Sequence, residues 1–160
     1  MTDAVKIVEG LPEVIQELLG SAYTISYDEL KLKSLDPSTV LLAIIRQGGS
    51  GSAQVLANYG LTEQNVRQVI RGNSDLRKRD KKSKDIWGQR HKNLQPIVYS
   101  AASVEMLKLL SKKEHHKSKT IYIANTLEAV ILSKSDVVEK IFRSVGLKMG
   151  AVRRDLGIGS

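Results

Sequence analysis

A glycine-rich stretch, GGSGS at residues 48–52, precedes a short apolar segment and is the first place to look for chemistry. The backbone amides of such a turn can cradle a phosphate group when a helix follows. A P-loop also needs a lysine and a hydroxyl residue after its last glycine, to reach the phosphates and magnesium. Here Ser52 and Ala53 stand in those positions. The sequence therefore predicts a plain turn between two helices, without ATP hydrolysis or tight nucleotide binding.

Histidine is the next residue type that could carry chemistry, and the chain has three: His91, His115 and His116. Two adjacent residues on a helix point in different directions, so His115 and His116 cannot chelate one metal as an i, i+4 pair would. The chain has no cysteine, which excludes thiolate zinc sites, cysteine nucleophiles and disulfides. No GxSxG, HExxH or dinucleotide-binding motif occurs. We therefore expect no metal, no cofactor and no enzymatic activity.

Positive charge is concentrated in one segment. The formal net charge is +8, and between Arg71 and Lys92 nine basic residues face three acidic ones. One interpretation is a solvated linker between two folded parts. The other is a contact for acidic protein or nucleic acid, which would bind phosphates without sequence preference and with Trp87 available to stack. The basic patch would consist of Arg77, Lys78, Arg79, Lys81, Lys82 and Lys84.

The composition, 41% hydrophobic and 26% charged over 160 residues, is ordinary for a soluble globular protein of one domain. No apolar run approaches the roughly 20 residues that a membrane span needs. The first ten residues contain acidic side chains and no long apolar core, so we expect no signal peptide. Together with the absence of cysteine, this predicts a cytoplasmic protein.

Residues 35–60 are expected to position the glycine-rich turn. Asp36 is a good helix cap, and Pro37 suits the first helical turn. The apolar run at residues 40–45 predicts a helix buried on nearly all sides. A shorter helix follows the glycines and ends at Gly60, a typical helix stop. The stretch therefore predicts a helix, a turn and a second helix.

The same pattern recurs at residues 121–146, where an apolar helix is followed by a polar break and by a second helix that ends at Gly146. The offset from Gly60 to Gly146 is 86 residues, and a further short helix is expected after each glycine, at residues 63–70 and 149–156. Such self-similarity predicts that the chain contains about two copies of one helical unit.

The other helices of the two copies follow from apolar spacing and caps. The apolar residues in the first part of 12–31 are spaced as in a helix, although the β-branched and aromatic run at residues 23–27 weakens the helix prediction. In the second copy we expect a first helix from Ser100 to about His115 and a second from about Asn125. The first ten residues are expected to be a frayed start or a short helix, and the last four a disordered tail.

The order of an apolar helix, Arg-Gln-Gly-Gly at residues 46–49, a short helix, Gly-Leu-Thr at 60–62 and a further helix resembles the Clp N-terminal repeat. That repeat forms the double four-helix module at the front of the Clp-type AAA+ unfoldases. Ile-Val-Tyr-Ser at residues 97–100 is similar to the aromatic-plus-hydroxyl start of the repeat. The resemblance implies an all-α domain of two pseudo-repeats, residues 11–72 and 96–157, joined by a basic linker at 73–95.

The resemblance also implies a function. It suggests a protein-interaction module of the Clp unfoldase and protease system, which binds a substrate, an adaptor or a partner subunit. The module would be either free-standing or the N-domain of an unfoldase, and it would take a segment of its partner in a groove between the repeats. The ATPase engine of the family is absent from this chain.

In some members a Thr-Glu-His triplet opens the second helix of each repeat, and its glutamate helps to grip phosphorylated arginine. The matching triplets here, Pro-Ser-Thr at 37–39 and Ile-Ala-Asn at 123–125, have no glutamate. Serine and alanine cannot make the bidentate bond of a carboxylate to a guanidinium, so this route to phosphoarginine is not expected. The positions that the family implies for peptide or partner binding are Ser38, Thr39, Ala124 and Asn125.

An alternative from another class is a small basic helical protein that binds nucleic acid. Residues 63–72 follow a short turn and would serve as its recognition helix. A recognition helix needs its basic residues on the face that enters the groove. The positive charge here lies mostly in the predicted linker, which favours the protein-binding hypothesis.

Overall fold

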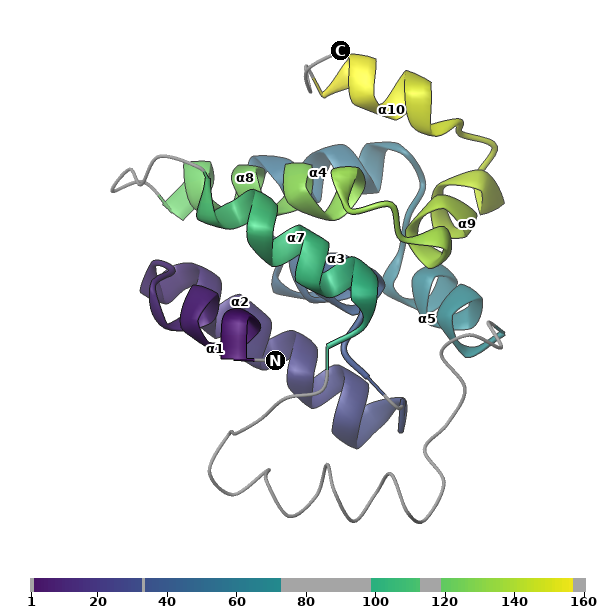
Figure 1. The fold of residues 1–160 in the computed structure, drawn as a ribbon. Helices are drawn as coiled ribbons and strands as arrows, with labels where there is room; N and C mark the ends of the chain where they lie inside the picture. Colours follow the sequence, from purple (N-terminus) through teal and green to yellow (C-terminus); the bar gives the residue numbers. More distant parts are fainter. Residues whose placement is uncertain (1, 33, 73–98, 113–118, 157–160) are drawn as a thin grey trace.

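The computed structural model of the chain describes residues 2–32, 34–72, 99–112 and 119–156. Every named element in these ranges is a helix, which confirms the all-α prediction (Figure 1). The basic patch at residues 77–84, the three histidines and the predicted tail at 157–160 lie outside the described residues. The helices are α1 (Thr2–Glu9), α2 (Glu13–Thr24), the π-helix η1 (Ile25–Glu29), α3 (Pro37–Gln47), α4 (Gly51–Asn58), α5 (Glu63–Arg71), α7 (Ala101–Ser111), α8 (Lys119–Leu132), α9 (Asp136–Ser144) and α10 (Met149–Asp155).

Helix α3 lies at the centre of the molecule (Figure 1). It begins as predicted, with Asp36 accepting a hydrogen bond of 3.1 Å from the backbone N–H of Ser38 and with Pro37 in the first turn. Its first eight residues are all buried, which confirms that the helix is apolar on nearly every side because it is enclosed. It packs against α2, α4, α5, α8 and α9.

The two predicted helix–turn–helix stretches are present as α3–α4 and α8–α9. Each second helix begins at a serine whose side chain accepts a backbone N–H, Ser50 at 3.0 Å and Ser135 at 3.2 Å. Each stretch ends at a glycine of positive φ, +89° at Gly60 and +81° at Gly146. The local structure of the two stretches therefore agrees with the sequence prediction.

Two predicted boundaries are wrong. Helix α8 begins at Lys119 and not near Asn125. No proline or glycine interrupts residues 119–132, so nothing in this stretch stops a helix from starting early. Thr126, next to the predicted start, does not cap the helix and donates instead to the backbone carbonyl of Tyr122 at 2.8 Å, one turn back. Helix α7 ends at Ser111, with Lys112 as its C-cap, which is earlier than predicted, and His115 itself lies outside the described residues.

We call residues 2–72 the first half and residues 99–156 the second half. The halves share one apolar core, since α3 packs on both α8 and α9, and α8 packs in turn on α2, α3 and α4. Their third helices differ in placement: α5 packs between α3 and α9, whereas α10 packs mainly on α9 at the edge of the molecule (Figure 1).

The run at residues 23–27 that weakened the helix prediction coincides with a change of helix type. Helix α2 passes directly into the π-helix η1, whose end is marked by a bond of 2.9 Å from Leu30 N–H to the carbonyl of Ile25. The rings of Tyr23 and Tyr27 stack there with centroids 5.7 Å apart. Aromatic and β-branched side chains lose rotamer freedom in an α-helix, and this run is where the α-helix gives way to the π-helix.

Candidate functional site

Asp36 joins the two halves. Its side chain is 4% exposed and accepts hydrogen bonds of 2.9 Å from the hydroxyls of Ser100 and Ser135, in addition to the bond from Ser38 N–H. Ser100 and Ser135 are themselves the N-caps of α7 and α9. One buried carboxylate therefore gathers the N-terminal ends of three helices, where the positive helix dipoles favour a negative charge.

A second set of bonds ties the segment before α7 to the segment before α3. The backbone N–H of Ser100 donates to the carbonyl of Leu35 at 2.9 Å, and the hydroxyl of Ser103 donates to the same carbonyl at 2.6 Å. Leu35 and Tyr99 form an isolated parallel bridge. Burial raises the pKa of the Tyr99 phenol to about 12. Together with the bonds to Asp36, these contacts tie the starts of α3, α7 and α9 to one another.

The family-implied binding positions do not form one surface. Ser38 and Thr39 are fully buried, and the Thr39 hydroxyl donates to the carbonyl of Asp36 at 2.8 Å and accepts from Ser26 at 2.9 Å. Neither residue is open to a partner in this conformation, because the shared core covers the start of α3. On α8, Ala124 is exposed and Asn125 is half-buried. The predicted basic patch lies outside the described residues.

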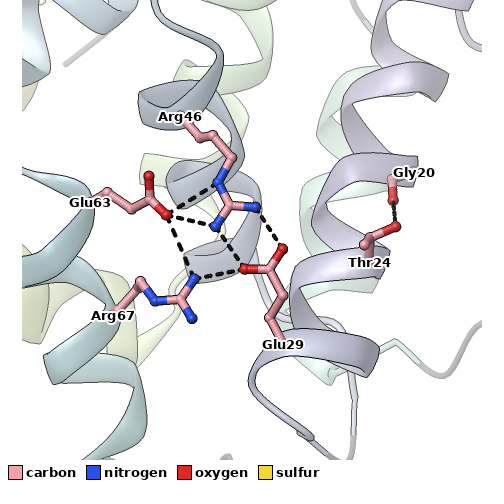
Figure 2. A network of polar contacts seen from close by, with 6 residues as sticks. All are labelled: Gly20, Thr24, Glu29, Arg46, Glu63 and Arg67. Carbon is pink, nitrogen blue, oxygen red and sulfur yellow. Dashed lines mark hydrogen bonds and ion pairs between the residues drawn. The ribbon is translucent and has the colours of Figure 1, made fainter.

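A network of two arginines and two glutamates closes one surface site of the first half (Figure 2). Arg46, at the end of α3, makes a bidentate contact with Glu29 of η1, at 2.6 and 2.7 Å. The same guanidinium donates to one oxygen of Glu63 on α5, at 2.6 and 3.2 Å. Arg67 completes the network, 2.8 Å from Glu29 and 3.6 Å from Glu63. We call these four residues the arginine–glutamate network.

The network is neutral and only partly sheltered, since the exposed fractions of its side chains range from 19% for Arg67 to 40% for Glu63. The hydrogen bonds from Arg46 lower the pKa of Glu29 to about 2, against the opposing effect of burial, and Arg67 adds to the lowering. The same bonds to Glu29 and Glu63 raise the pKa of Arg46. These groups are therefore satisfied by one another and offer little to a ligand.

The second half has a pocket beside the end of α8. Its volume is about 360 Å³, and it lies between the end of α8, the start of α9 and α10. We call it the α8–α10 pocket. Its lining consists of Ile131, Leu132, Lys134, Ser135, Asp136, Glu139, Met149 and Arg153. Under the 86-residue offset, three of these take the places of network residues: Leu132 for Arg46, Met149 for Glu63 and Arg153 for Arg67.

The lining of the α8–α10 pocket is apolar at the α8 end and charged elsewhere. Asp136 and Glu139 both belong to the first turns of α9, and Glu139 also pairs with Arg143 at 2.6 Å. Lys134 lies in the turn between α8 and α9 with a φ of +66°, which is unfavourable for a side chain larger than glycine. The hydrogen bond from the Ser135 hydroxyl to Asp36 fixes this strained turn to the first half.

Sequence reasoning missed both the network and the pocket. Glu63 and Arg67 are four residues apart on a predicted helix, a spacing that indicates an ion pair. Nothing local to them points to Glu29, which is 38 residues from Arg67. The pocket had no signal of its own, because it depends on where α10 packs.

The described residues also bear on the nucleic-acid alternative. Helix α5, the suggested recognition helix, packs between α3 and α9, and its Arg67 is engaged with two glutamates. The described ranges together contain 14 basic and 13 acidic residues. A groove-reading surface needs an excess of positive charge, and the described part of the chain has almost none.

Two classes of site are absent from the described ranges. They contain no group of three or more histidine, cysteine or acidic residues that could hold a metal ion. None of their helices combines the length and the apolar character that crossing a membrane requires. Comparison of the chain with protein-family models and with curated proteins found no match.

Proposed function

We propose that this protein is a protein-interaction module that binds a segment of a partner protein in the α8–α10 pocket. The observation that carries the proposal is the contrast between the halves. The first half has its arginine–glutamate network at the end of α3, whereas the second half has an open pocket of about 360 Å³ at the end of α8.

The size and lining of the pocket suit a side chain or two of a bound segment. Small-molecule sites typically have volumes of about 300–1,000 Å³, so this pocket is at the lower end. Its apolar floor of Ile131, Leu132 and Met149 would hold an anchor side chain, and its charged rim would orient it. A few buried anchors surrounded by polar contacts are the usual anatomy of a protein–protein contact.

The biological setting of the proposal comes from the resemblance to the Clp N-terminal repeat. In that setting the partner is a substrate, an adaptor or an unfoldase or protease subunit, the location is the cytoplasm, and the module has no catalytic activity. The pseudo-repeat arrangement of residues 11–72 and 96–157 remains part of this proposal, whereas the proposed site is the α8–α10 pocket in place of the expected groove between the repeats.

Site-specific photo-crosslinking tests the proposal. A photoreactive amino acid would be placed at Met149, in the pocket, and at Gln64, an exposed position on α5. We expect discrete protein adducts from Met149 in the source cells and none from Gln64. Adducts to nucleic acid in place of protein would overturn the proposal and promote the basic nucleic-acid-binding alternative.

The partner recovered in this way would then be purified and its binding measured by calorimetry. Leu132→Arg puts the first-half residue into the second half and is expected to close the pocket and abolish binding. Ala124→Arg is the matched control, because it adds the same side chain at an exposed, family-implied position of the same helix. Equal binding by wild type and Leu132→Arg would contradict a role for the pocket.

A further inference from the structure

We infer that α10 is an arm that opens separately from the rest of the molecule and forms the moving wall of the α8–α10 pocket, so that it admits a partner segment and closes on it. The closing on a partner rests on the proposed function, whereas the separate opening does not. The inference is carried by how α10 packs, how it begins, which residues it contains and how the opposite wall is held.

Helix α10 is attached to the molecule by little buried surface. It packs mainly on α9 at the edge of the molecule (Figure 1). Among its apolar side chains Val152 is fully buried, whereas Met149 and Leu156 are half-buried. The Tyr59 hydroxyl donates to Asp155 at 3.4 Å, which is longer than a typical O–H···O bond. A segment with few buried apolar contacts opens at a fraction of the free energy of global unfolding.

Helix α5 shows how a short helix is held more firmly. It packs between α3 and α9 and buries both Val66 and Ile70. Its Arg67 also donates to Glu29 at 2.8 Å. Opening of α5 would therefore uncover the shared core, whereas opening of α10 would uncover mainly one face of α9.

The start of α10 lacks a side-chain cap. Helices α3, α4, α5, α7 and α9 each begin at a side chain that accepts a backbone N–H. Lys148 takes the capping position of α10 and makes no such bond, although its backbone, at φ −99° and ψ 143°, has the extended conformation of a cap. Thr62, 86 residues earlier, caps α5 by accepting from the N–H of Asn65 at 3.1 Å. The first turn of α10 is therefore less stable than that of α5.

The length of α10 and its Gly150 weaken the helix further. Seven residues form only about two turns, too few for a helix to be stable without packing. Gly150 has no positive φ, and a Cβ added there would meet no atom within 4 Å. Neither the backbone nor the space requires a glycine at this position, and glycine makes a helix less stable than alanine does.

The hinge of the arm lies at Lys148. Before it, Gly146 has a φ of +81° and the N–H of Leu147 donates to the carbonyl of Phe142 at 3.0 Å, as in a Schellman end of a helix. The backbone is thus fixed to α9 as far as Leu147, and α10 begins after the next residue. A change in the dihedral angles of Lys148 would swing α10 and leave α9 undisturbed.

The opposite wall of the pocket is fixed to the core. It consists of the end of α8 and the start of α9, where Ile131 and Ser135 are buried. The Ser135 hydroxyl is bonded to Asp36 of the first half at 2.9 Å. Helix α10 contributes Met149 and Arg153 to the lining. Opening of α10 therefore widens the pocket from one side, and a segment larger than its volume of about 360 Å³ can enter.

Hydrogen exchange of the backbone amides in the full chain, followed by NMR, tests the separate opening. We expect protection factors about 100-fold or more lower for Val152 and Leu156, both bonded within α10, than for Ile141 on α9. A helix that opens as a unit gives Val152 and Leu156 similar protection, whereas fraying of the chain end protects Val152 much better. Equal protection of α10 and α9, or a steep gradient along α10, would overturn the inference.

Two variants should hold the arm closed. Lys148→Ser supplies the missing cap and Gly150→Ala a better helix former, so each should raise the protection factor of Val152 about fivefold. Lys108→Ser, the same substitution at an exposed position of α7, is the control and should leave Val152 unchanged. No increase in either α10 variant would contradict the opening of α10 as a helix.

The partner recovered from the Met149 crosslinks tests the closing. Added in large excess over its dissociation constant, it should raise the protection factor of Val152 about tenfold or more, because a bound segment holds α10 against the opposite wall. If the partner binds and this protection does not change, the moving wall is wrong and the proposed function stands. If no partner is recovered while α10 opens separately, the proposed function is wrong, and the closing on a partner is wrong with it.

Discussion

The ends of the two most buried helices, α3 and α8, lead to opposite kinds of surface. After α3, Arg46 reaches two glutamates and seals the site with ion pairs. After α8, Leu132 stands 86 residues beyond Arg46 in the sequence, and an open pocket of about 360 Å³ lies beside it. The two surfaces differ both in the side chains at their rim and in the placement of the third helix, since α5 packs between α3 and α9 whereas α10 packs mainly on α9.

The turns beside the two sites differ as well. Gly48 ends α3 with φ +61° and ψ −174°, a backbone region that only glycine occupies readily. In the second half the corresponding turn carries Lys134 at φ +66°. The first half has therefore a relaxed turn beside a closed site, and the second half has a strained turn beside an open one.

The largest effect should come from replacing Asp36, whose hydrogen bonds hold the starts of α3, α7 and α9 together. Asp36→Ala removes a helix cap and leaves the hydroxyls of Ser100 and Ser135 without their acceptor. We expect a loss of about 3 kcal/mol in the free energy of unfolding, measured by urea denaturation. Asp36→Asn keeps one acceptor oxygen and should lose less than half as much. A loss below about 1 kcal/mol for the alanine variant would contradict the role of this carboxylate.

The next effect concerns the relaxed turn. Gly48→Ala should cost about 2 kcal/mol, because alanine is strained in this backbone conformation. An added Cβ would meet no atom within 4 Å, so the cost is conformational and not a clash. Thermal melting with calorimetry measures it. Gly51→Ala is the control, since Gly51 has no positive φ and an equally open Cβ position. Equal losses in the two variants would mean that the turn is not held in this conformation.

A smaller effect should follow from opening the closed site. Arg46→Leu copies the second-half residue and should cost about 1 kcal/mol near neutral pH, because the network is partly exposed and screened. Glu29 has a pKa lowered from 4.5 to about 2, so its contribution is full above pH 4.5 and is lost as the pH falls toward 2. The wild type should therefore lose this stability in that window, and Arg46→Leu should lose much less, because only Arg67 still lowers the pKa of Glu29 there.

Urea denaturation between pH 2 and pH 6 provides the measurement for the Arg46 variant. Arg143→Leu breaks an exposed pair with Glu139 and should change stability by no more than about 0.5 kcal/mol at any of these pH values. A pH profile for Arg46→Leu that runs parallel to the wild type would show that Glu29 is not stabilised by this arginine.

The smallest effect should be a gain. Lys134→Gly copies the glycine of the first-half turn and relieves the strain of a positive φ, partly offset by the greater freedom of glycine in the unfolded chain. We expect a net stabilisation of about 0.5 kcal/mol, seen as a melting temperature about 1–2 °C higher. A lower melting temperature would show that the lysine side chain stabilises the turn by contacts that outweigh its strain.

The helices could be predicted because their signals are local. Asp36 with Pro37, Ser50 and Gly60 mark ends that the structure confirms, since caps and stops act within one turn of the chain. The start of α8 was missed for the same reason, because no local stop separates Lys119 from Asn125.

The surfaces could not be predicted because they depend on contacts between distant residues. Glu29 and Arg46 are 17 residues apart, and Asp36 and Ser135 are 99 apart. No spacing rule reaches over such separations, and only the packing of η1, α3 and α9 brings these side chains together. The burial of Ser38 and Thr39 could not be predicted either, since it comes from the second half covering the start of α3.

The π-helix at Ile25–Glu29 sets the direction in which Glu29 points, relative to the core-facing side of α2. A π-turn holds one residue more than an α-turn, and successive residues of an α-helix are about 100° apart around its axis. Deletion of one residue from this segment would restore a regular α-helix and rotate the core-facing side of α2 by about that angle relative to Glu29. The chain could then seat either Leu18 and Leu19 in the core or Glu29 on Arg46, but not both. The extra residue of the π-turn thus lets one continuous helix present Leu18 and Leu19 to the core and Glu29 to Arg46.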